Sequence, residues 1–277
     1  MKKLLLSSVF AVSAFALAAC GTAGSGEAGS SESSKLIVGA SNVPHAEILE
    51  EAKPLLEEQG VELEIKTFQD YILPNKSLAG KELDANYFQH IPYLESQMAE
   101  NEDYDFVNAG GIHIEPIGVY SKKYKSLEEL PEGATIIMSN SVADHGRILT
   151  MLESEGLIKL NEGVEKTTAT VEDIAENSKD IQFKADVEAS LLPQIYNNDE
   201  GDAVLINTNY AIDAGLSPQN DAIALEGADS PYVNIIAVNK GDEGKKEVKA
   251  LVEVLHSEEI QKFIEEKYEG AVVPVDK

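Results

Sequence analysis

Apolar and polar residues follow one another in blocks along most of the chain, and the period changes from block to block. Residues 35–41 are almost continuously apolar, which is typical of a buried strand. Residues 44–60 place apolar side chains at helical spacing and end at Gly60, a common helix stop. Residues 61–68 alternate with a period of two. The folded region is therefore predicted to begin near Leu36 with a strand, a helix and a half-exposed strand.

Residues 70–97 have no simple period. Asn75, Gly80, Asp84 and Asn86 interrupt the apolar runs there. Because such residues favour turns over regular elements, this region predicts turns and short helices on a loop-rich face.

Strands and helices alternate again in the rest of the chain. The pattern predicts strands over 112–123, 134–139, 181–186, 202–207 and 232–239. It predicts helices that begin at Arg147 and end at Gly156, over 187–198, and once or twice within 244–268. Two α/β modules of similar size are the simplest interpretation.

The first twenty residues have the layout of a secretory signal: two lysines, an apolar run over residues 4–19 and then Cys20. The apolar run is shorter than the roughly 20 residues expected of a membrane span. The string LAAC at 17–20 resembles the bacterial lipobox, whose cysteine becomes the lipidated (palmitate-bearing) N-terminus. The alternative is a free or buried Cys20 in an uncleaved leader. Residues 21–35 have the Gly, Ser, Ala and Glu composition of a flexible tether.

The charge balance excludes nucleic acid as a partner. The chain has 22 Lys and Arg against 49 Asp and Glu, a formal charge of −27, and such a surface repels anions at long range. A ligand without net charge is little affected. Cys20 is the single cysteine, so no intramolecular disulfide forms. No phosphate loop, nucleophile elbow or cofactor fingerprint is present, and we expect no cofactor.

Arg147 is the only arginine of the chain. It is predicted to lie in the first turn of a helix, after the small residue Gly146, where unpaired backbone N–H groups favour an anion. The planar guanidinium binds a carboxylate with two parallel hydrogen bonds, which lysine cannot do. The competing interpretation is a surface arginine that pairs with one of the many acids.

Two further groups of residues are candidates for a binding site. Tyr87, Phe88, His90 and Tyr93 fall within seven residues and form either a pocket wall or ordinary core. The segment 206–211 places two asparagines just after a very apolar strand, where α/β sheets bind ligands. Asparagines at this position bind a ligand or cap the next helix.

Five long strings carry a specific resemblance. They are DYILPNKSLAGKELDANYFQHIPYL (70–94), HIEPIGVYSKK (113–123), GRILTMLESEGLIKL (146–160), AVLINTNYAIDAGLSP (203–218) and DSPYVNIIAV (229–238). In this order they resemble the methionine-binding lipoproteins of ABC importers, the NlpA lipoprotein family. The resemblance runs from about Leu36 to near the C-terminus.

The resemblance implies an α/β, two-lobed periplasmic-binding-protein-like fold with a hinge and an interlobe ligand cleft. It implies a signal peptide over 1–19, a lipidated tether over 20–35, a first lobe over 36–120 and 231–277, and a second lobe over 121–230. The implied function is not enzymatic. A lipid-anchored protein on the extracytoplasmic face of the cell membrane would deliver methionine, or a related amino acid, to an importer permease and its ATPase.

The resemblance also implies roles for individual residues. Tyr87, Phe88 and His90 would form the apolar end of the pocket, and Glu115 and Tyr120 would lie near the lobe crossing. Arg147 would bind the ligand carboxylate. Asn209, with Asn207 as the weaker candidate, would hold the polar end of the ligand.

One loop departs from the family pattern. Before Gly-Arg the family has a loop of the type Pro-Asn-Asp-Pro-Thr-Asn, whereas residues 139–147 read SNSVADHGR. Asn140 keeps one position, but Asp144 stands where the pocket asparagine is expected. A carboxylate repels the ligand carboxylate and attracts its ammonium group. Asp144 therefore either rearranges the polar contacts or points outward, and the departure leaves the exact ligand open.

Other functions stay open. His45, His90, His113 and His145, with Glu115 close to His113 in the chain, are transition-metal ligand types, although no pair has a tight ligand spacing. Asp144, His145 or Glu115 would be the acid or base of an enzyme. The ligand could also be another amino acid or a short methionine-containing peptide.

Overall fold

The computed structural model describes residues 33–227 and 230–276. Within these ranges no helix combines the length and the apolar character needed to cross a membrane. The predicted signal peptide, Cys20 and nearly all of the tether lie outside the described residues. Strand β1 (Ser34–Ser41) already includes the last two residues assigned to the tether.

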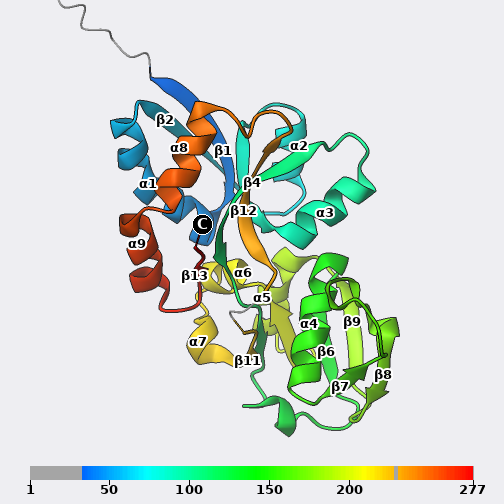
Figure 1. Cartoon of the computed structure of the whole chain (residues 1–277). Helices are drawn as coiled ribbons and strands as arrows, with labels where there is room; N and C mark the ends of the chain where they lie inside the picture. Colours follow the sequence, from blue (N-terminus) through cyan, green and yellow to red (C-terminus); the bar gives the residue numbers. More distant parts are fainter. Residues whose placement is uncertain (1–32, 228–229, 277) are drawn as a thin grey trace, which may run out of the picture. The chain divides into compact units, whose positions relative to one another are not determined.

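A six-stranded sheet forms the first lobe, in the order β13-β4-β12-β3-β1-β2 (Figure 1). Its strands besides β1 are β2 (Val61–Phe68), β3 (Ala85–His90), β4 (Phe106–Ile114), β12 (Val233–Asn239) and β13 (Val273–Pro274). Strand β1 pairs in parallel with β2 and β3, whereas β12 is antiparallel to both β3 and β4. The sheet is therefore mixed, and a segment from late in the chain completes it.

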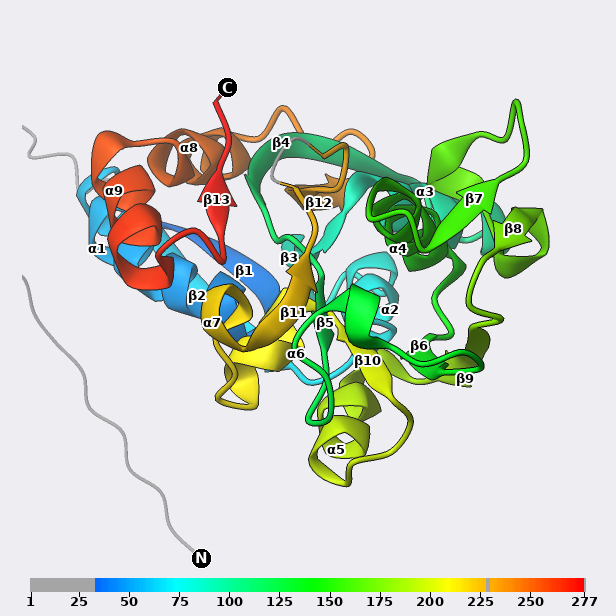
Figure 2. The same ribbon diagram turned by 90° about the horizontal axis from the view of Figure 1, so that it is seen from below.

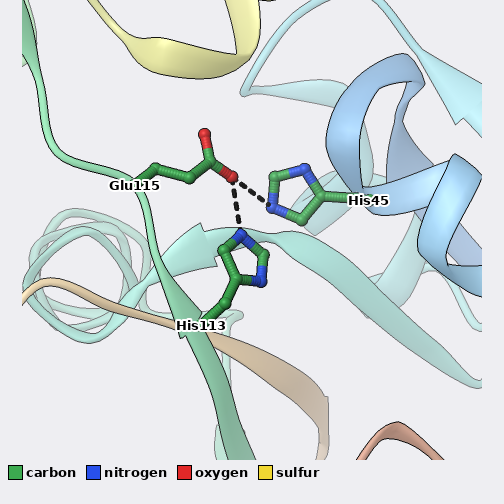
Figure 3. A group of neighbouring side chains, drawn as sticks. All are labelled: His45, His113 and Glu115. Carbon is green, nitrogen blue, oxygen red and sulfur yellow. Dashed lines mark hydrogen bonds and ion pairs between the residues drawn. The ribbon is translucent and has the colours of Figure 1, made fainter. Parts of the chain in front are cut away.

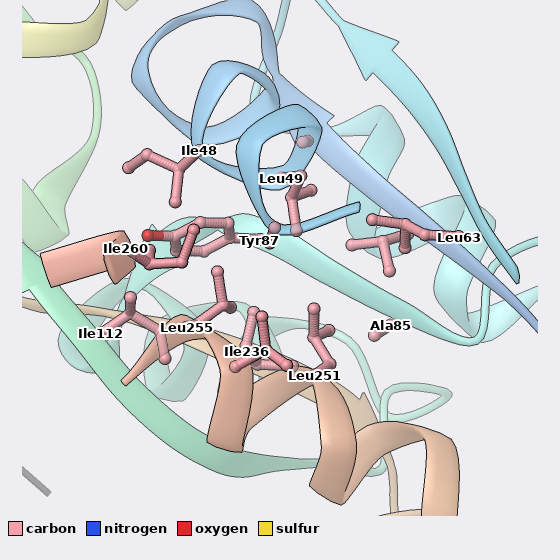
Figure 4. Packing of buried hydrophobic residues seen from close by; sticks show 14 of the residues in the cluster. Ile48, Leu49, Leu63, Ala85, Tyr87, Ile112, Ile236, Leu251, Leu255 and Ile260 are labelled. Carbon is pink, nitrogen blue, oxygen red and sulfur yellow. The ribbon is translucent and has the colours of Figure 1, made fainter. Parts of the chain in front are cut away.

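Helices cover both faces of this sheet. Helices α1 (Glu47–Glu58), α8 (Lys246–Leu255) and α9 (Glu258–Tyr268) pack on one face, and α2 (Leu73–Ala79) and α3 (Ile91–Glu100) pack on the other. Figure 4 shows side chains of α1 and α8, such as Leu49 and Leu251, meeting Ile236 and Tyr87 from the sheet. Burial on one helical face of α1 explains the apolar spacing in its sequence.

A five-stranded sheet forms the second lobe, in the order β11-β5-β10-β6-β9. The strands are β5 (Gly118–Tyr120), β6 (Thr135–Ser139), β9 (Gln182–Val187), β10 (Ala203–Ile206) and β11 (Ala222–Leu225). Helix α4 (Val142–Ser154) packs on one face, and α5 (Leu192–Asn197) and α6 (Thr208–Asp213) on the other. The remaining elements are α7 (Pro218–Asp221), the pair β7 (Ile158–Leu160) and β8 (Ile174–Asn177), and the short helical turns η1 (Asn42–Ala46), η2 (Leu127–Glu129), η3 (Lys166–Thr168), η4 (Val171–Asp173) and η5 (Ala189–Leu191).

Two neighbouring segments join the sheets, as Figures 1 and 2 show. The chain leaves the first sheet after β4 and enters the second at β5, and it returns between β11 and β12. Because β4 pairs with β12 and β5 pairs with β11, the two crossings run side by side. The lobe boundaries at residues 120 and 230 stay a prediction.

Three of the differences between the structure and the sequence prediction concern the elements that carry the site. Helix α4 begins at Val142, so the prediction that Arg147 opens this helix was wrong. Residues 112–123 contain parts of two strands, β4 and β5, separated at Pro116. Strand β3 lies in the region predicted to be loop-rich. All six residues of β3 are buried because helices cover both faces, so its sequence does not alternate.

Polar side chains inside β3 are satisfied by one another and by α2. Gln89 donates to Asn75 Oδ1 (2.8 Å) and to Asn86 Oδ1 (2.9 Å), and Asn75 donates back to Gln89 Oε1 (2.9 Å). Buried amides of this kind are tolerated when their hydrogen bonds are made. This network explains how a sequence as polar as ANYFQH occupies the middle of a sheet.

Gly146 fixes the position of α4 against the turn η3. A Cβ atom there would lie 2.2 Å from the carbonyl oxygen of Lys166 and 2.7 Å from the carbonyl carbon of Thr167. Both neighbours are backbone atoms, so neither could move aside cheaply. Glycine is therefore required for the close contact that places the following residue, Arg147.

Candidate functional site

A cavity lies where β3 and β10 end, between residues of both lobes. Aromatic, amide and charged side chains line it: Tyr71, Phe88, Gln89, His90, Tyr93, Glu115, Asp144, Arg147, Asn207, Thr208, Asn209 and Asn234. The position agrees with the rule that α/β sheets bind ligands beyond the carboxyl ends of their strands.

Three aromatic rings form the apolar wall of the cavity. The ring centroids of Tyr71 and Phe88 are 6.0 Å apart, those of Phe88 and Tyr93 are 6.0 Å apart, and those of Tyr71 and Tyr93 are 5.9 Å apart. Tyr93 Oη donates to the carbonyl of Tyr71 (3.0 Å), and Tyr71 Oη donates to Asn209 Oδ1 (2.6 Å). These bonds fix the rings in place and connect the wall to the second lobe.

Arg147 lines the cavity and is buried, 4% exposed. Its Nε donates to Glu226 Oε2 (3.0 Å), and Nη2 donates to the same oxygen and to the carbonyl of Glu115 (2.7 Å). The guanidinium also lies over the ring of Tyr232, 4.7 Å from its centroid. Burial alone would lower the pKa of Arg147, but the charge and hydrogen bond of Glu226 raise it above its ordinary value. A lysine could not make these contacts together.

Asp144 is also buried and accepts hydrogen bonds from three side chains. His90 Nε2 lies 3.2 Å from Oδ1, and Asn207 Nδ2 (3.0 Å) and Ser139 Oγ (3.3 Å) donate to Oδ2. Burial raises the pKa of Asp144, but the hydrogen bonds from His90 and Asn207 and the charge of Arg147 outweigh burial and lower the pKa to about 2. Asp144 is thus an inward-facing carboxylate, and the alternative that it points outward was wrong.

Glu115 lies on the first crossing, with two histidines on one of its carboxylate oxygens (Figure 3). His113 Nε2 is 2.8 Å and His45 Nε2 is 3.2 Å from Oε1. His113 Nδ1 is in turn bonded to Tyr87 Oη, and His45 Nε2 also lies 3.0 Å from Asn234 Oδ1. Burial raises the pKa of Glu115 and lowers the pKa of His45 to about 4 and that of His113 to about 3.

The structure brings seven of the ten predicted ligand-binding residues to the cavity. They are Phe88, His90, Glu115, Asp144, Arg147, Asn207 and Asn209. Tyr87 lies behind the wall, in the core of the first lobe. Tyr120 lies in the core of the second lobe, and its hydroxyl has no hydrogen-bond partner among the described residues. Asn140 is exposed and donates to Glu188 (3.0 Å).

Sequence reasoning missed five lining residues: Tyr71, Gln89, Tyr93, Thr208 and Asn234. All five lie within the strings used for the family resemblance, and Tyr93 had also been noted as part of an aromatic group. Glu226, the partner of Arg147, carried no signal, because it is one acid among many.

The histidines considered as metal ligands separate into two groups. The ligand atoms of His45, His113 and Glu115 lie within 4.8 Å of one another. His90 instead pairs with Asp144, and His145 Nε2 lies 2.9 Å from the carbonyl oxygen of Ser139. The first group has ligand types suited to a transition metal, and its hydrogen bonds account for it without one.

The whole folded chain matches one family model, that of the NlpA lipoproteins, over residues 36–276. The chain belongs to the NlpA lipoprotein family. This NlpA lipoprotein is 57% identical over 242 residues to the methionine-binding lipoprotein MetQ of Bacillus subtilis, covering 87% of this chain and 88% of that protein. It is 37% identical over 239 residues to the D-methionine-binding lipoprotein MetQ of Salmonella typhi, covering 86% of each.

Solved structures agree with this membership. A putative methionine-binding lipoprotein of Bacillus subtilis superposes with a TM-score of 0.86 at 56% identity, covering 88% of this chain and 98% of that one. A nutrient-binding protein of Burkholderia cenocepacia, solved with methionine bound, superposes with a TM-score of 0.81 at 41% identity, covering 87% and 100%. The predicted two-lobed α/β fold of this NlpA lipoprotein is confirmed.

Proposed function

We propose that this NlpA lipoprotein binds methionine in the cavity between its lobes and delivers it to an ABC importer. The observation that carries the proposal is the set of groups that meet in one cavity: a buried arginine, two buried carboxylates and three aromatic rings. A zwitterion with an apolar tail has a group to match each of them. Relatives over the full folded length are named for methionine binding.

Arg147 is proposed to bind the ligand carboxylate. The hydrogen bonds described above use Nε and Nη2 for Glu226 and the backbone of Glu115. We assign the N–H groups of Nη1 to the ligand. Glu226 then holds the guanidinium in position while the ligand binds its other side, which requires several donors in one plane. This need for several donors in one plane explains why the only arginine of the chain stands at this position.

The ligand ammonium group is proposed to bind near Glu115. An unpaired buried ammonium is very costly, so it needs oxygen acceptors. Glu115 lines the cavity with one oxygen already used by histidines, and Asn209 and Asn207 line the cavity nearby. Asp144 contributes negative charge at the same end but is already held by three donors.

The thioether is proposed to lie against Tyr71, Phe88 and Tyr93. Sulfur meets aromatic edges favourably, by about 0.3–1.5 kcal/mol per contact. Since such contacts distinguish methionine from leucine only modestly, specificity also depends on the length and shape of the space between the rings and Arg147.

Ligand binding is proposed to draw the lobes together about the paired crossings, and the importer permease and its ATPase would respond to the closed form. Hydrogen bonds between the two lobes beside the cavity, such as Tyr71 with Asn209 and His90 with Asp144, support this proposal. Cys20 would carry the lipid anchor that holds the protein on the extracytoplasmic face of the membrane.

Calorimetric titration and native mass spectrometry test the proposal. We expect the purified protein to carry, or to bind one equivalent of, L- or D-methionine, and to bind leucine more weakly. Zinc chloride and alanine serve as comparison ligands. Binding of zinc without any response to amino acids would contradict the proposal, and conversion of bound methionine to another compound would indicate an enzyme.

A further inference from the structure

We propose that His45, His113 and Tyr87 are positioning residues for ligand binding: they hold Glu115 from behind so that its second oxygen faces the ligand ammonium group. None of these three side chains is among the residues that line the cavity. Together with Asn234 they form what we call the Glu115 network. The inference rests on the proposed function, since it concerns an amino acid with a free ammonium group.

The geometry of the network is convergent. His113 Nε2 and His45 Nε2 both approach the same oxygen, Oε1, at 2.8 and 3.2 Å. Figure 3 shows the two rings on one side of the carboxylate and the second oxygen pointing away from both. His45 and His113 are 1% and 0% exposed, so water does not compete for these bonds.

The chain of partners also fixes which ring nitrogens carry protons. Burial lowers the pKa of both histidines, which keeps both rings neutral. When Glu115 is ionised, its carboxylate is an acceptor only, so each Nε2 then donates to it. His113 Nδ1 is then an acceptor, and Tyr87 Oη donates to it. For His45, the Nε2–H is shared with Asn234 Oδ1 at 3.0 Å.

The remaining nitrogen of His45 argues against a metal at the same place. Its Nδ1 is buried without a hydrogen-bond partner among the described residues. In the proposed tautomer this atom is an unused lone pair. If a metal occupied both Nε2 positions, the proton of His45 would move to Nδ1 and leave a buried N–H without an acceptor, which is unfavourable. When both Nε2–H groups instead donate to the carboxylate of Glu115, no N–H of His45 is left without an acceptor.

The consequence for binding is that the orientation of Glu115 is set before the ligand arrives. Two N–H donors oppose the cost of burying the negative charge and stop the carboxylate from rotating. The oxygen left over is held where an ammonium group can reach it. Without the donors, the carboxylate would take up a proton or turn aside, and a ligand would lose the partner for its positive charge.

Removal and replacement of the donors test the proposal. His45→Leu and His113→Leu remove the N–H groups, whereas His45→Gln and His113→Gln keep an N–H donor at similar reach. Tyr87→Phe removes only the hydroxyl behind His113. Tyr268→Phe is the matched control, because Tyr268 belongs to the same core but its hydrogen bonds go to Glu47 (2.7 Å) and to the carbonyl of Pro44 (3.4 Å), not to either histidine. Each variant is titrated with methionine and with the desamino analogue of methionine, which lacks the ammonium group.

We expect each leucine variant to bind methionine about tenfold more weakly or worse, while its affinity for the desamino analogue stays within about twofold or rises. The glutamine variants should recover most of the methionine affinity, Tyr87→Phe should lose about threefold, and Tyr268→Phe should match the unmodified protein.

Three results would overturn the proposal. Equal weakening toward both ligands would mean that the histidines act only through the fold, and no weakening would mean that Glu115 needs no support. One equivalent of zinc that is bound by the unmodified protein and lost in His45→Leu would mean a metal site. Failure of the unmodified protein to bind methionine at all would instead refute the proposed function, and this inference with it.

Discussion

Two buried carboxylates line the same cavity and behave in opposite ways. Glu115 and Asp144 are 6% and 2% exposed, and each is bonded to histidine. Burial raises the pKa of Glu115, whereas for Asp144 the hydrogen bonds and the charge of Arg147 overcome burial and bring the pKa to about 2. Burial alone therefore does not decide the charge of an acid; the number and charge of its donors do.

The origin of the donors distinguishes the two sites further. The two imidazoles that bond Glu115 come from the first lobe, and the backbone of Asn209 in the second lobe also bonds its carboxyl group. Asp144, on α4, accepts side-chain hydrogen bonds from His90 of the first lobe and from Asn207 and Ser139 of the second. Asp144 thus joins the lobes without needing a ligand. Arg147 lies near Glu115, but within the described residues its hydrogen bond to Glu115 goes to the backbone carbonyl and not to the carboxylate. The ammonium group of a ligand is suited to bind that carboxylate.

The largest effect is expected from Arg147, which lies beside both acids and lowers the pKa of each. Arg147→Lys should keep the fold and weaken methionine binding at least tenfold, about 1.4 kcal/mol or more. The ammonium group of lysine cannot bond Glu226, the backbone and a ligand in one plane. Calorimetric titration measures the affinity, and thermal unfolding serves as the control for the fold. Equal affinities of the two proteins would refute the assignment of the carboxylate site.

Lowering the pH should destabilise the folded protein through the buried histidines of the Glu115 network. The pKa of His45 is lowered to about 4 from 6.5. As the pH falls below 6.5, the unfolded chain therefore takes up a proton that the folded chain does not, and stability falls until about pH 4. The raised pKa of Glu115 acts in the opposite direction and offsets part of this loss. Burial also lowers the pKa of His113, so this residue adds to the loss of stability.

Replacing His45 isolates its share of the acid effect. From about pH 7 to about pH 4.5, the unmodified protein should lose about 2 kcal/mol more unfolding free energy than His45→Gln, because glutamine does not titrate. Urea denaturation at both pH values measures the difference. Identical losses in the two proteins would show that His45 does not titrate as its burial implies.

Asp144→Asn tests the other buried carboxylate, and its expected effect on methionine affinity is smaller. Removing one negative charge beside Arg147 should raise methionine affinity about threefold, or about 0.6 kcal/mol, because the ligand carboxylate meets less repulsion. Asn keeps a group able to accept from Asn207. No gain, or a loss, would mean that the aspartate is matched to a ligand of this protein other than methionine.

The smallest effect is expected for a carboxylate outside the cavity. Glu176 pairs with Lys159 across β7 and β8 at 3.1 Å, and their side chains are 69% and 59% exposed. Such pairs contribute little because water screens them. Glu176→Gln should leave both methionine affinity and the denaturation midpoint unchanged within error. A clear shift in either would mean that exposure is not what separates these acids from Glu115 and Asp144.

Periodicity predicted elements whose burial is one-sided or continuous, such as β1, α1 and β2. It missed β3, because a strand buried on both faces that carries its own amide network has neither alternation nor an apolar run. It placed the start of α4 at Arg147 instead of Val142, since five residues of mixed polarity precede the arginine. Local pattern does not record which residues a neighbouring lobe covers.

The site was predicted best where the side chain itself is unusual. Arg147 is unique in the chain, and the structure places it in the cavity. Tyr87 shows the limit of such reasoning: its neighbour Phe88 lines the cavity, whereas Tyr87 points to the opposite face of β3, into the core. Glu226 could not be selected from sequence, because only the folded chain brings it to Arg147, which is 79 residues away.

The contact between Gly146 and the turn at Lys166 and Thr167 has a consequence for how this protein tolerates change. Gly146 is not among the residues that line the cavity, yet a methyl group there would push α4 outward and carry the arginine and the aspartate with it. Random mutagenesis with selection for nutrient uptake should therefore accept only glycine at this position. Attempts to redirect the protein to new cargo are best made at the aromatic wall.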